Sequence, residues 1–401
     1  MALAAGADYP ALFRVYVQQS ARPLLRRAQA SSGAPTEQMR QQAWHALSYS
    51  LKLPEGWPDS RDLLLALAPK MEQAGHRDDW MPFLQQGLAI SREVGDARGT
   101  AALLFQMGLL QQRQSQLQAA RQSLSESVAI YERLDDHVEM RRSFNRLAFV
   151  ARLERRFDEA RELAQTALSI APFDPHEAAY SHLVLGAIAT DNQAWQRARE
   201  CFEQSLALLS ATDDVRLRAW SHSNLGIAFS GIGRYPDAIY HFQQAIILLA
   251  EIQDSLYLAN TRVNLGNTYV AMAEYESALA HFQAAEDIFR RLQDKVRIAA
   301  IEANRGFAFQ KMGRLRDAQA VYERNVLAWR ALDQLPYLVN TLDNLGEVLL
   351  AQGAWGQAQG VFESALQELH AKATDASLDA LRDMVNAHLQ EAKNQAPDQG
   401  A

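Results

Sequence analysis

A repeat with a period of about 40 residues runs through most of the chain and is the strongest constraint on its fold. A small residue, Gly or Ala, ends a similar short segment seven times, at steps of 40, 38, 40, 40, 40 and 40 residues. These residues are Gly108, Ala148, Gly186, Gly226, Gly266, Gly306 and Gly346. Chance similarity does not keep one register over such a length, so we expect a linear array of like units.

Other positions keep the same register in the seven units. The residue nine positions after the small residue is large, and the residue twelve positions after it is always alanine. The alanines are Ala120, Ala160, Ala198, Ala238, Ala278, Ala318 and Ala358. Sixteen positions after the small residue the side chain is usually aromatic, as in Phe202, Phe242, Phe282, Tyr322 and Phe362. This spacing predicts two amphipathic helices per unit, which approach closely at the small residues, with the aromatic rings between neighbouring hairpins.

Turn and cap residues fall between these predicted helices. Gly233, Gly313 and Gly353 lie in the expected turn within a unit, and Pro236 is expected in the first turn of a second helix. Aspartates stand where the next first helix should begin, and their carboxylates can accept hydrogen bonds from its free amides. They are Asp136, Asp214, Asp254 and Asp294. Because one hairpin cannot bury its apolar face alone, we expect the units to stack as a solenoid.

On these residues the sequence resembles the tetratricopeptide repeat (TPR) family, over at least residues 99–370. The resemblance implies an all-α fold, a right-handed superhelical solenoid of antiparallel helix pairs. Family units usually have about 34 residues. The longer unit here is similar to the extended repeats of Pins-type polarity scaffolds, kinesin light chains and bacterial signalling arrays. Composition agrees, since only 20 Gly and 12 Pro interrupt 401 residues that are 48% hydrophobic.

Three regions are expected along the chain. Residues 1–57 form an N-terminal helical segment, with an amphipathic helix over 36–53 followed by a break. Residues 58–370 form the solenoid of about eight repeats, of which the first is degenerate because Pro69 lies inside its first helix and Trp80 replaces the alanine. Residues 371–401 form a capping helix and, from Asn394, a loose tail.

Charge and composition narrow the class of protein. A net charge of -7 does not suggest nucleic-acid binding. A single cysteine, Cys201, excludes an internal disulfide and a thiolate-rich metal site. The N-terminus lacks the apolar core of a signal peptide, and no run of 18 apolar residues occurs, so we expect a cytoplasmic protein that does not bind membranes.

Catalytic and metal-binding patterns are weak. The chain has no glycine-rich phosphate loop or nucleophile elbow, and Cys201 is expected to be a buried structural thiol. Two histidine pairs, His182 with His222 and His241 with His281, are one repeat apart and are expected to lie close together. With no third ligand in sight, we expect polar packing positions, and the predictions are no metal, no cofactor and no enzyme.

The resemblance points to an inner surface lined by the first helices. It implies that the residues two and six positions before the small residue, and the one after it, face a concave groove. Two before it the chain has Asn224, Asn264, Asn304 and Asn344. Asparagine amides donate and accept hydrogen bonds and so can hold the backbone of an extended peptide. The alternative is that part of this row serves the scaffold, since asparagine is common at this place in the family.

Further groove candidates occupy the other two positions. Six before the small residue are Tyr180, Trp220, Asn260 and Asn340, and Asn267 follows Gly266. Aromatic anchors often dominate interface energy, so Trp220 and Tyr180 are expected to grip an apolar side chain of a partner. The alternative for these rings is packing against the adjacent repeat.

A basic cluster comprises Arg141, Arg142, Arg146, Arg152, Arg155 and Arg156. Arg142 and Arg146 match the two cationic positions of the carboxylate clamp of chaperone-binding TPR proteins, and Gln106 stands in place of an asparagine. Leu65 and Pro69 replace the clamp's lysine and first asparagine, so the clamp is at most half present. The alternatives are a solvated helix face, partly paired with neighbouring acids, or a site for an acidic partner segment.

The favoured function is therefore a non-catalytic scaffold that binds a peptide segment of a partner protein in its groove. The alternative is a sensing arm of a bacterial regulatory complex, which would act through a separate effector chain. Self-association through an open end of the solenoid is a further possibility.

Overall fold

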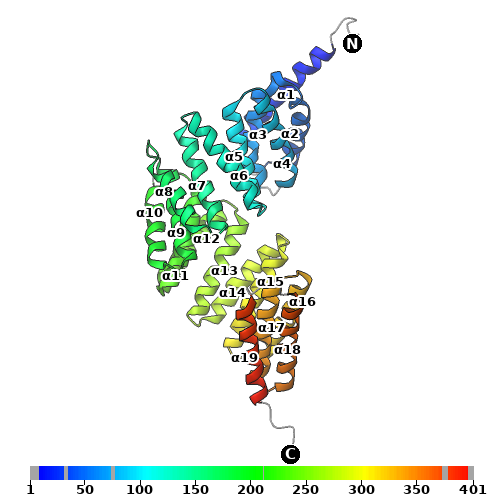
Figure 1. Ribbon diagram of the computed structural model, residues 1–401, viewed down its shortest axis with the longest axis vertical. Coiled ribbons are helices and arrows are strands. Elements are labelled where there is room, and N and C mark those ends of the chain that lie inside the picture. The colour runs from blue at the N-terminus through cyan, green and yellow to red at the C-terminus, as the bar shows by residue number, and fades with distance from the viewer. Residues whose placement is uncertain (1–8, 31–34, 74–76, 211, 373–377, 396–401) are drawn as a thin grey trace, which may run out of the picture. The chain divides into compact units, whose positions relative to one another are not determined.

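The computed structural model describes residues 9–30, 35–73, 77–210, 212–372 and 378–395 (Figure 1). Within these ranges every regular element is a helix and none is a strand, which confirms the expected all-α solenoid of helix pairs. The chain divides into two compact units. The N-terminal unit comprises residues 1–192 with 207–212, and the C-terminal unit comprises residues 193–206 with 213–401.

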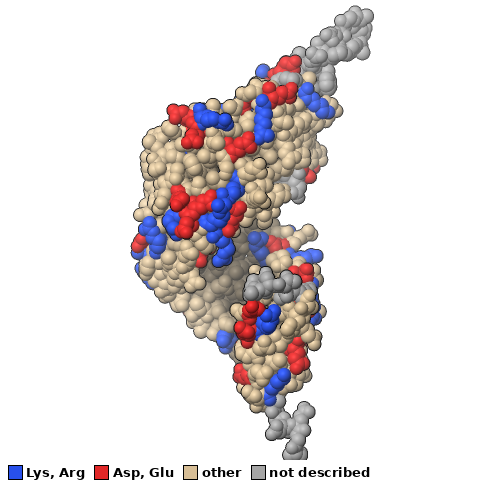
Figure 2. Space-filling view, viewed as in Figure 1, with Lys and Arg blue, Asp and Glu red and all other residues tan. Residues whose placement is uncertain are grey.

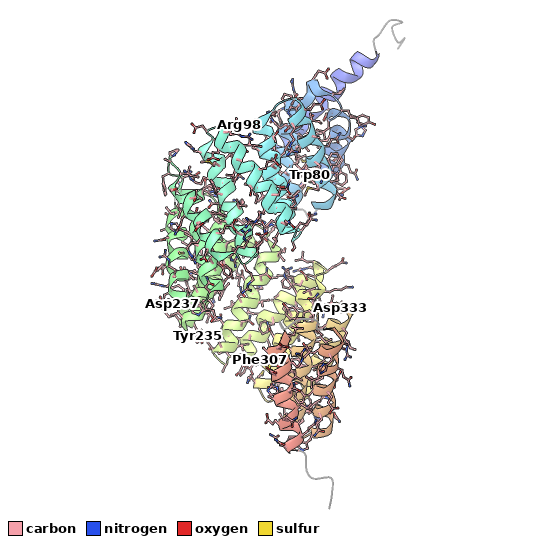
Figure 3. All side chains as sticks on the ribbon, in the orientation of Figure 1. Trp80, Arg98, Tyr235, Asp237, Phe307 and Asp333 are labelled. Carbon is pink, nitrogen blue, oxygen red and sulfur yellow. The ribbon has the colours of Figure 1, made fainter. Side chains whose placement is uncertain are left out.

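The N-terminal unit contains four consecutive helix pairs and one further helix. Its elements are α1 (Tyr9–Ala30), α2 (Glu37–Ser50), a 3-10 turn (Pro54–Gly56), α3 (Trp57–Gln73), α4 (Arg77–Glu93), α5 (Ala97–Arg113), α6 (Leu117–Arg133), α7 (His137–Leu153), α8 (Phe157–Ser169) and α9 (Pro175–Asp191). The helix expected over 36–53 is α2, and Thr36 caps it by accepting a hydrogen bond from the Met39 amide. The residues predicted to form a degenerate first repeat contain α3 and α4, where Pro69 lies inside α3 and Trp80 is fully buried among the N-terminal helices (Figure 3).

The C-terminal unit continues the pairing and ends with a single helix. Its elements are α10 (Trp195–Leu209, with residues 207–209 assigned to the other unit), α11 (Val215–Ile232), α12 (Tyr235–Glu251), α13 (Ser255–Ala271), α14 (Tyr275–Arg291), α15 (Lys295–Lys311), α16 (Leu315–Ala331), α17 (Leu335–Ala351), α18 (Trp355–Lys372) and α19 (Asp379–Gln395). The last helix, α19, contacts α17 and α18 and buries Val385 and Leu389. Helix α19 continues through Asn394 and Gln395, two residues that were expected to belong to a loose tail. The remaining residues of that expected tail lie outside the described part of the chain.

Small residues and aromatic rings form the contact inside each hairpin. All seven register alanines are 0% exposed, as expected for a close helix crossing. The Phe242 ring covers Gly226, and the Phe282 ring covers Gly266, so tightly that a methyl group on either glycine would lie 2.5–2.7 Å from ring carbons. Each of these rings thus meets the glycine of its own hairpin, a contact that the sequence analysis did not predict. Where the small residue is Ala148, the aromatic position holds Ala164, which keeps the combined volume low.

The turns and caps follow the sequence signals. Gly233, Gly313 and Gly353 have φ of 86°, 73° and 76°, a left-handed conformation that costs glycine least. The four register aspartates cap α7, α11, α13 and α15, each accepting from the amide three residues ahead. Pro236 lies in the first turn of α12. None of the described helices is long and apolar enough to span a bilayer.

Candidate functional site

The row of four asparagines lies on the first helices of four successive hairpins in the C-terminal unit. These helices, α11, α13, α15 and α17, contact one another in order along the unit. Hydrogen bonds between polar side chains link them, including one of 3.0 Å between the hydroxyls of Ser223 and Thr261. All four asparagines, Asn224, Asn264, Asn304 and Asn344, are half-buried. The amides therefore lie on one side of the unit, where the helices that carry them are neighbours.

The four amides differ in what they bond. Asn224 Nδ2 donates to the backbone oxygen of Trp220 at 2.8 Å, one turn earlier in its own helix. Asn304 Nδ2 donates to Asn267 Oδ1 at 3.2 Å, across to the preceding first helix, and Asn267 is exposed. Within the described residues, the side-chain amides of Asn264 and Asn344 form no hydrogen bond. Two members of the row thus retain their full hydrogen-bonding capacity for a partner.

The other groove candidates are divided between the two units. Trp220, in the C-terminal unit, is half-buried and its ring centroid lies 4.8 Å from that of Tyr257 in the next hairpin. Tyr180, in the N-terminal unit, is only 7% exposed, and the guanidinium of Arg146 lies 3.5 Å from its ring centroid. Both rings thus make the packing contacts given as the alternative. In the same register position Asn260 is half-buried and Asn340 is exposed.

Arg142 lines a cavity of about 440 Å³ in the N-terminal unit. Its guanidinium lies 4.9 Å from the ring centroid of Phe105 and 3.6 Å from the Glu139 carboxylate. Four of the five positions compared with the carboxylate clamp border this cavity, namely Leu65, Pro69, Gln106 and Arg142, whereas Arg146 is not part of its lining. Acidic side chains, among them Asp62, Asp136 and Glu139, line it as well, so it is not a purely cationic site.

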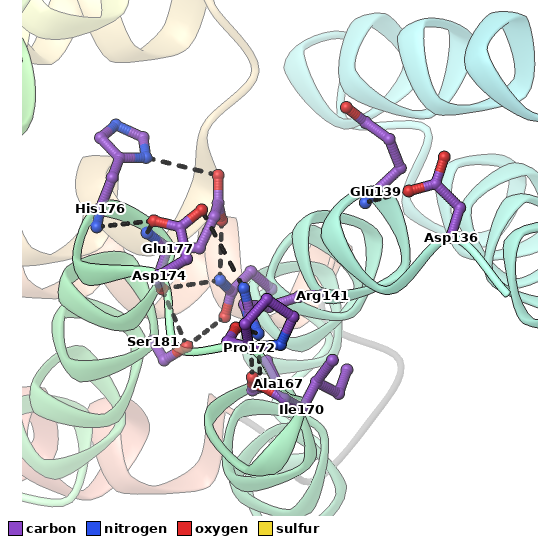
Figure 4. Close-up of polar contacts among 11 residues, drawn as sticks. Asp136, Glu139, Arg141, Ala167, Ile170, Pro172, Asp174, His176, Glu177 and Ser181 are labelled. Atoms are coloured by element: carbon purple, nitrogen blue, oxygen red, sulfur yellow. Dashed lines mark hydrogen bonds and ion pairs between the residues drawn. The ribbon is translucent and has the colours of Figure 1, made fainter.

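The arginine cluster is only partly the solvated face considered from the sequence. Arg156 is exposed and pairs with Glu159 at 2.8 Å, and Arg152 pairs with Asp191 at 2.6 Å. Figure 2 shows the same intermixing, with basic side chains next to acidic ones over the face in view. Arg141 is different, because it is 2% exposed and donates to the backbone oxygens of Ala167, Ile170 and Pro172 (Figure 4). It satisfies carbonyls left open where α8 ends early, and so belongs to the fold.

A buried polar network beside Arg141 was missed by sequence reasoning (Figure 4). Asn145 Nδ2 donates to the backbone oxygen of Glu177 at 2.9 Å and to its carboxylate at 2.8 Å, while Ser181 donates to Asn145 Oδ1 at 2.6 Å. Burial alone would raise the pKa of Glu177, but hydrogen bonds from His176 and Asn145 and the charge of Arg146 lower that pKa to about 2. The network ties α7 to α9 around a carboxylate that stays ionised.

The structure shows a histidine pair that the repeat register did not predict. His222 Nδ1 and His241 Nδ1 lie 2.9 Å apart, which joins the two helices of one hairpin. Phe229 stacks on His241 with centroids 5.3 Å apart, and Tyr269 stacks on His281 in the same way at 5.4 Å. Burial, the His241 ring and Arg218 lower the pKa of His222 to about 4, and burial also lowers the pKa of His241. Cys201 is buried, and burial raises the pKa of its thiol, which fits a structural role.

A second group escaped the sequence analysis because one member lies outside the repeats. Asp343 and Glu347 lie one turn apart on α17, and His388 comes from α19. One potential ligand atom from each side chain lies within 4.8 Å of the others. The spacing of the two acids on one helix face was a visible signal, but nothing in the repeat register placed His388 beside them.

These features define the class first: a helical-repeat protein built of stacked hairpins, with polar side chains in register along its first helices. Family models described as tetratricopeptide repeat match residues 99–172, 176–251 and 297–367, and a second such model matches 258–292. The matches of the first model alone cover more than half of the sequence. The chain belongs to the tetratricopeptide repeat family.

Solved structures show the same fold at low sequence identity. The apo form of RapI is 17% identical with a TM-score of 0.52, covering 67% of this chain and 97% of its own. A signal transduction ATPase with a tetratricopeptide repeat sensor, from Pyrococcus horikoshii, is 12% identical with a TM-score of 0.61, covering 88% and 55%. A Rap protein complexed with competence and sporulation factor is 12% identical with a TM-score of 0.52, covering 84% and 99%. A comparison with curated proteins finds no match.

Proposed function

We propose that the chain is a non-catalytic interaction scaffold that binds an extended peptide segment of a partner protein along the first helices of its C-terminal unit. The observation that carries the proposal is the asparagine row, with one half-buried amide on each of four neighbouring first helices. An extended peptide presents backbone donors and acceptors at regular intervals, and amide side chains match both.

The asparagines of the row and the residues near them have different roles in this proposal. Asn264 and Asn344 receive the peptide backbone directly, and the pair Asn304–Asn267 is held in place by its own hydrogen bond. Trp220 presents the part of its ring left uncovered by Tyr257 as an apolar contact, and Asn260 and Asn340 flank the row in the same register. In the N-terminal unit, the guanidinium of Arg142, which borders the cavity, binds an acidic side chain of the partner. Arg146 and Tyr180 contribute through their stacked contact, which stabilises the helices that carry them.

The test uses a linear peptide selected from a random display library against the full chain, titrated calorimetrically into variants. We expect the double variant Asn264→Ala/Asn344→Ala to bind it about fivefold to 150-fold more weakly, because losing both direct amide contacts removes roughly 1–3 kcal/mol. The matched control is Gln243→Ala/Gln283→Ala, which removes two exposed amides from the second helices of the same region. Unchanged affinity in the asparagine variant, with its circular dichroism preserved, rejects this surface; equal losses in both variants reject the specificity of the row.

The second candidate is a sensing arm that acts through a separate effector chain. It is favoured by fold similarity over 88% of the chain to the ATPase with a tetratricopeptide repeat sensor. The two candidates differ in one outcome. A sensing arm changes its affinity for the effector when peptide is bound, whereas a simple scaffold binds both independently. Cytoplasmic location, self-association and the absence of nucleic-acid and membrane partners remain predictions from the sequence.

A further inference from the structure

Two carboxylates converge on one imidazole at the end of the C-terminal unit, where α19 lies beside α17 (Figure 1). His388 Nδ1 lies 2.8 Å from Asp343 Oδ1, and His388 Nε2 lies 3.7 Å from Glu347 Oε1. Both nitrogens of the ring therefore face acidic oxygens. The three side chains form a compact group of one nitrogen and two oxygen ligands.

No basic side chain other than His388 accompanies these carboxylates among the described residues. Asp343 is 3% exposed, and burying an ionised carboxylate is costly unless an opposite charge compensates it. Among the described residues, no lysine or arginine forms an ion pair with Asp343 or Glu347. A divalent cation bound to the imidazole would take the place of a ring proton and compensate both carboxylates.

Neighbouring side chains hold the Glu347 carboxylate in position. Gln310 Nε2 donates to Glu347 Oε2 at 3.2 Å, and the Tyr322 hydroxyl donates to Gln310 Oε1 at 3.3 Å. Glu347 thus uses one oxygen to bond Gln310 and keeps the other facing His388. Such outer hydrogen bonds orient metal ligands in proteins and raise the affinity of the site.

We propose that Asp343, Glu347 and His388 form a Zn²⁺ site that joins α19 to α17. Zn²⁺ accepts imidazole nitrogen together with carboxylate oxygen, whereas Mg²⁺ and Ca²⁺ take oxygen ligands. Zinc bonds of about 2.0–2.2 Å place tetrahedral ligand atoms about 3.3 Å apart. The three ligand atoms lie within 4.8 Å of one another, so rotation of the side chains is needed to bring both carboxylates to one ring nitrogen. Three protein ligands leave the fourth position to water. This proposal differs from the sequence-based expectation of no metal, which considered only the histidines within the repeats.

Calorimetric titration of ZnCl₂ into the full chain, after treatment with EDTA and dialysis, tests the site. We expect one-to-one binding and a higher unfolding temperature with zinc. His388→Gln and Glu347→Gln are each expected to weaken binding at least tenfold. His370→Gln is the matched control, because it removes an exposed histidine from α18 of the same unit. Absence of binding, or wild-type affinity in His388→Gln, overturns the proposal.

Two further measurements keep the test independent of folding defects. Co²⁺ in place of zinc is expected to produce the visible absorption bands of a four-coordinate site in the wild type and in His370→Gln, but not in His388→Gln. MgCl₂ at equal concentration is expected to give no stabilisation, and equal stabilisation by Mg²⁺ contradicts a site built on imidazole nitrogen. The peptide titration of the proposed scaffold is a separate measurement, so either proposal can fail alone.

Discussion

Asparagine has opposite uses in the two units. In the N-terminal unit, Asn145 is fully buried and bonds Glu177 and Ser181, so its amide is consumed in holding α7 to α9. In the C-terminal unit, Asn264 and Asn344 are half-buried, and their amides bond nothing among the described residues. The comparison indicates that a polar side chain in a repeat has a structural role when its neighbours complete its hydrogen bonds, and is available to bind a partner when they do not.

The largest effect on stability is expected from disrupting the Asn145 hydrogen-bond network in the N-terminal unit. Asn145→Ala removes two donated hydrogen bonds from Glu177, which stays buried and charged, and should lower the free energy of unfolding by about 2–4 kcal/mol. Urea denaturation followed by circular dichroism measures the change. Gln165→Ala, an exposed amide on α8, is the control and should change that free energy by less than about 0.5 kcal/mol. A loss in Asn145→Ala no larger than the control's would show that the network does not hold the unit together.

A smaller effect is expected where the C-terminal unit depends on shape alone. A methyl group at Gly346 would overlap the buried Phe362 ring, so Gly346→Ala should cost roughly 1–3 kcal/mol. Gly360→Ala, in the second helix of the same hairpin, meets no atom within 4 Å and should be stabilising by about 0.5–1 kcal/mol. Urea denaturation of the two variants checks both signs. Opposite signs support glycine–aromatic packing as the basis of the hairpin, and a neutral Gly346→Ala would exclude it.

The smallest expected effect concerns pH and the paired histidines. The pKa of His222 is about 4 in the folded chain, below its ordinary value of 6.5. Between these two pH values the unfolded chain therefore binds more protons than the folded chain. The contribution of His222 to the free energy of unfolding is fully present above about pH 6.5 and decreases as the pH falls toward 4. After allowance for partial exposure, the loss is on the order of 1–2 kcal/mol.

Urea denaturation at pH 7 and pH 5 measures this dependence in the wild type and in two variants. His222→Gln should lose much of the pH dependence, whereas His370→Gln should retain it. An unchanged slope in His222→Gln would mean that the pair does not sense protons. The charge of Arg218 acts on the pKa of His222, and the charge of Asp237 acts on the pKa of His241. Neither charged residue is changed in these variants.

The sequence predicted the features that recur and missed those that occur once. The buried alanines, the aspartate caps and the left-handed turn glycines follow from local rules repeated in several units, so a single sequence displays them more than once. Arg141 was misjudged because its burial depends on the early end of α8, which frees carbonyls that no periodicity marks. His388 was missed because it lies after the last repeat, and only the packing of α19 on α17 brings it to Asp343.

The candidate binding surface was predictable only in its recurring residues. Its asparagines were found from register, and their position on neighbouring first helices follows from the hairpin stacking. What the sequence did not show is that Trp220 packs on Tyr257 and that Arg146 covers Tyr180, because aromatic contacts between units depend on side-chain directions. The amides thus carry more of the proposed binding surface than the rings.

The side-chain amide resonances of asparagine give the most direct test of the contrast between the two units. They are to be recorded by transverse-relaxation-optimised NMR with and without the selected peptide, and assigned through single Asn→Ala variants. We predict that the resonances of Asn264, Asn304 and Asn344 shift at saturating peptide while that of Asn145 stays in place. Shifts confined to Asn145 or to the outer amide of Gln243, with the row unmoved, would contradict the account.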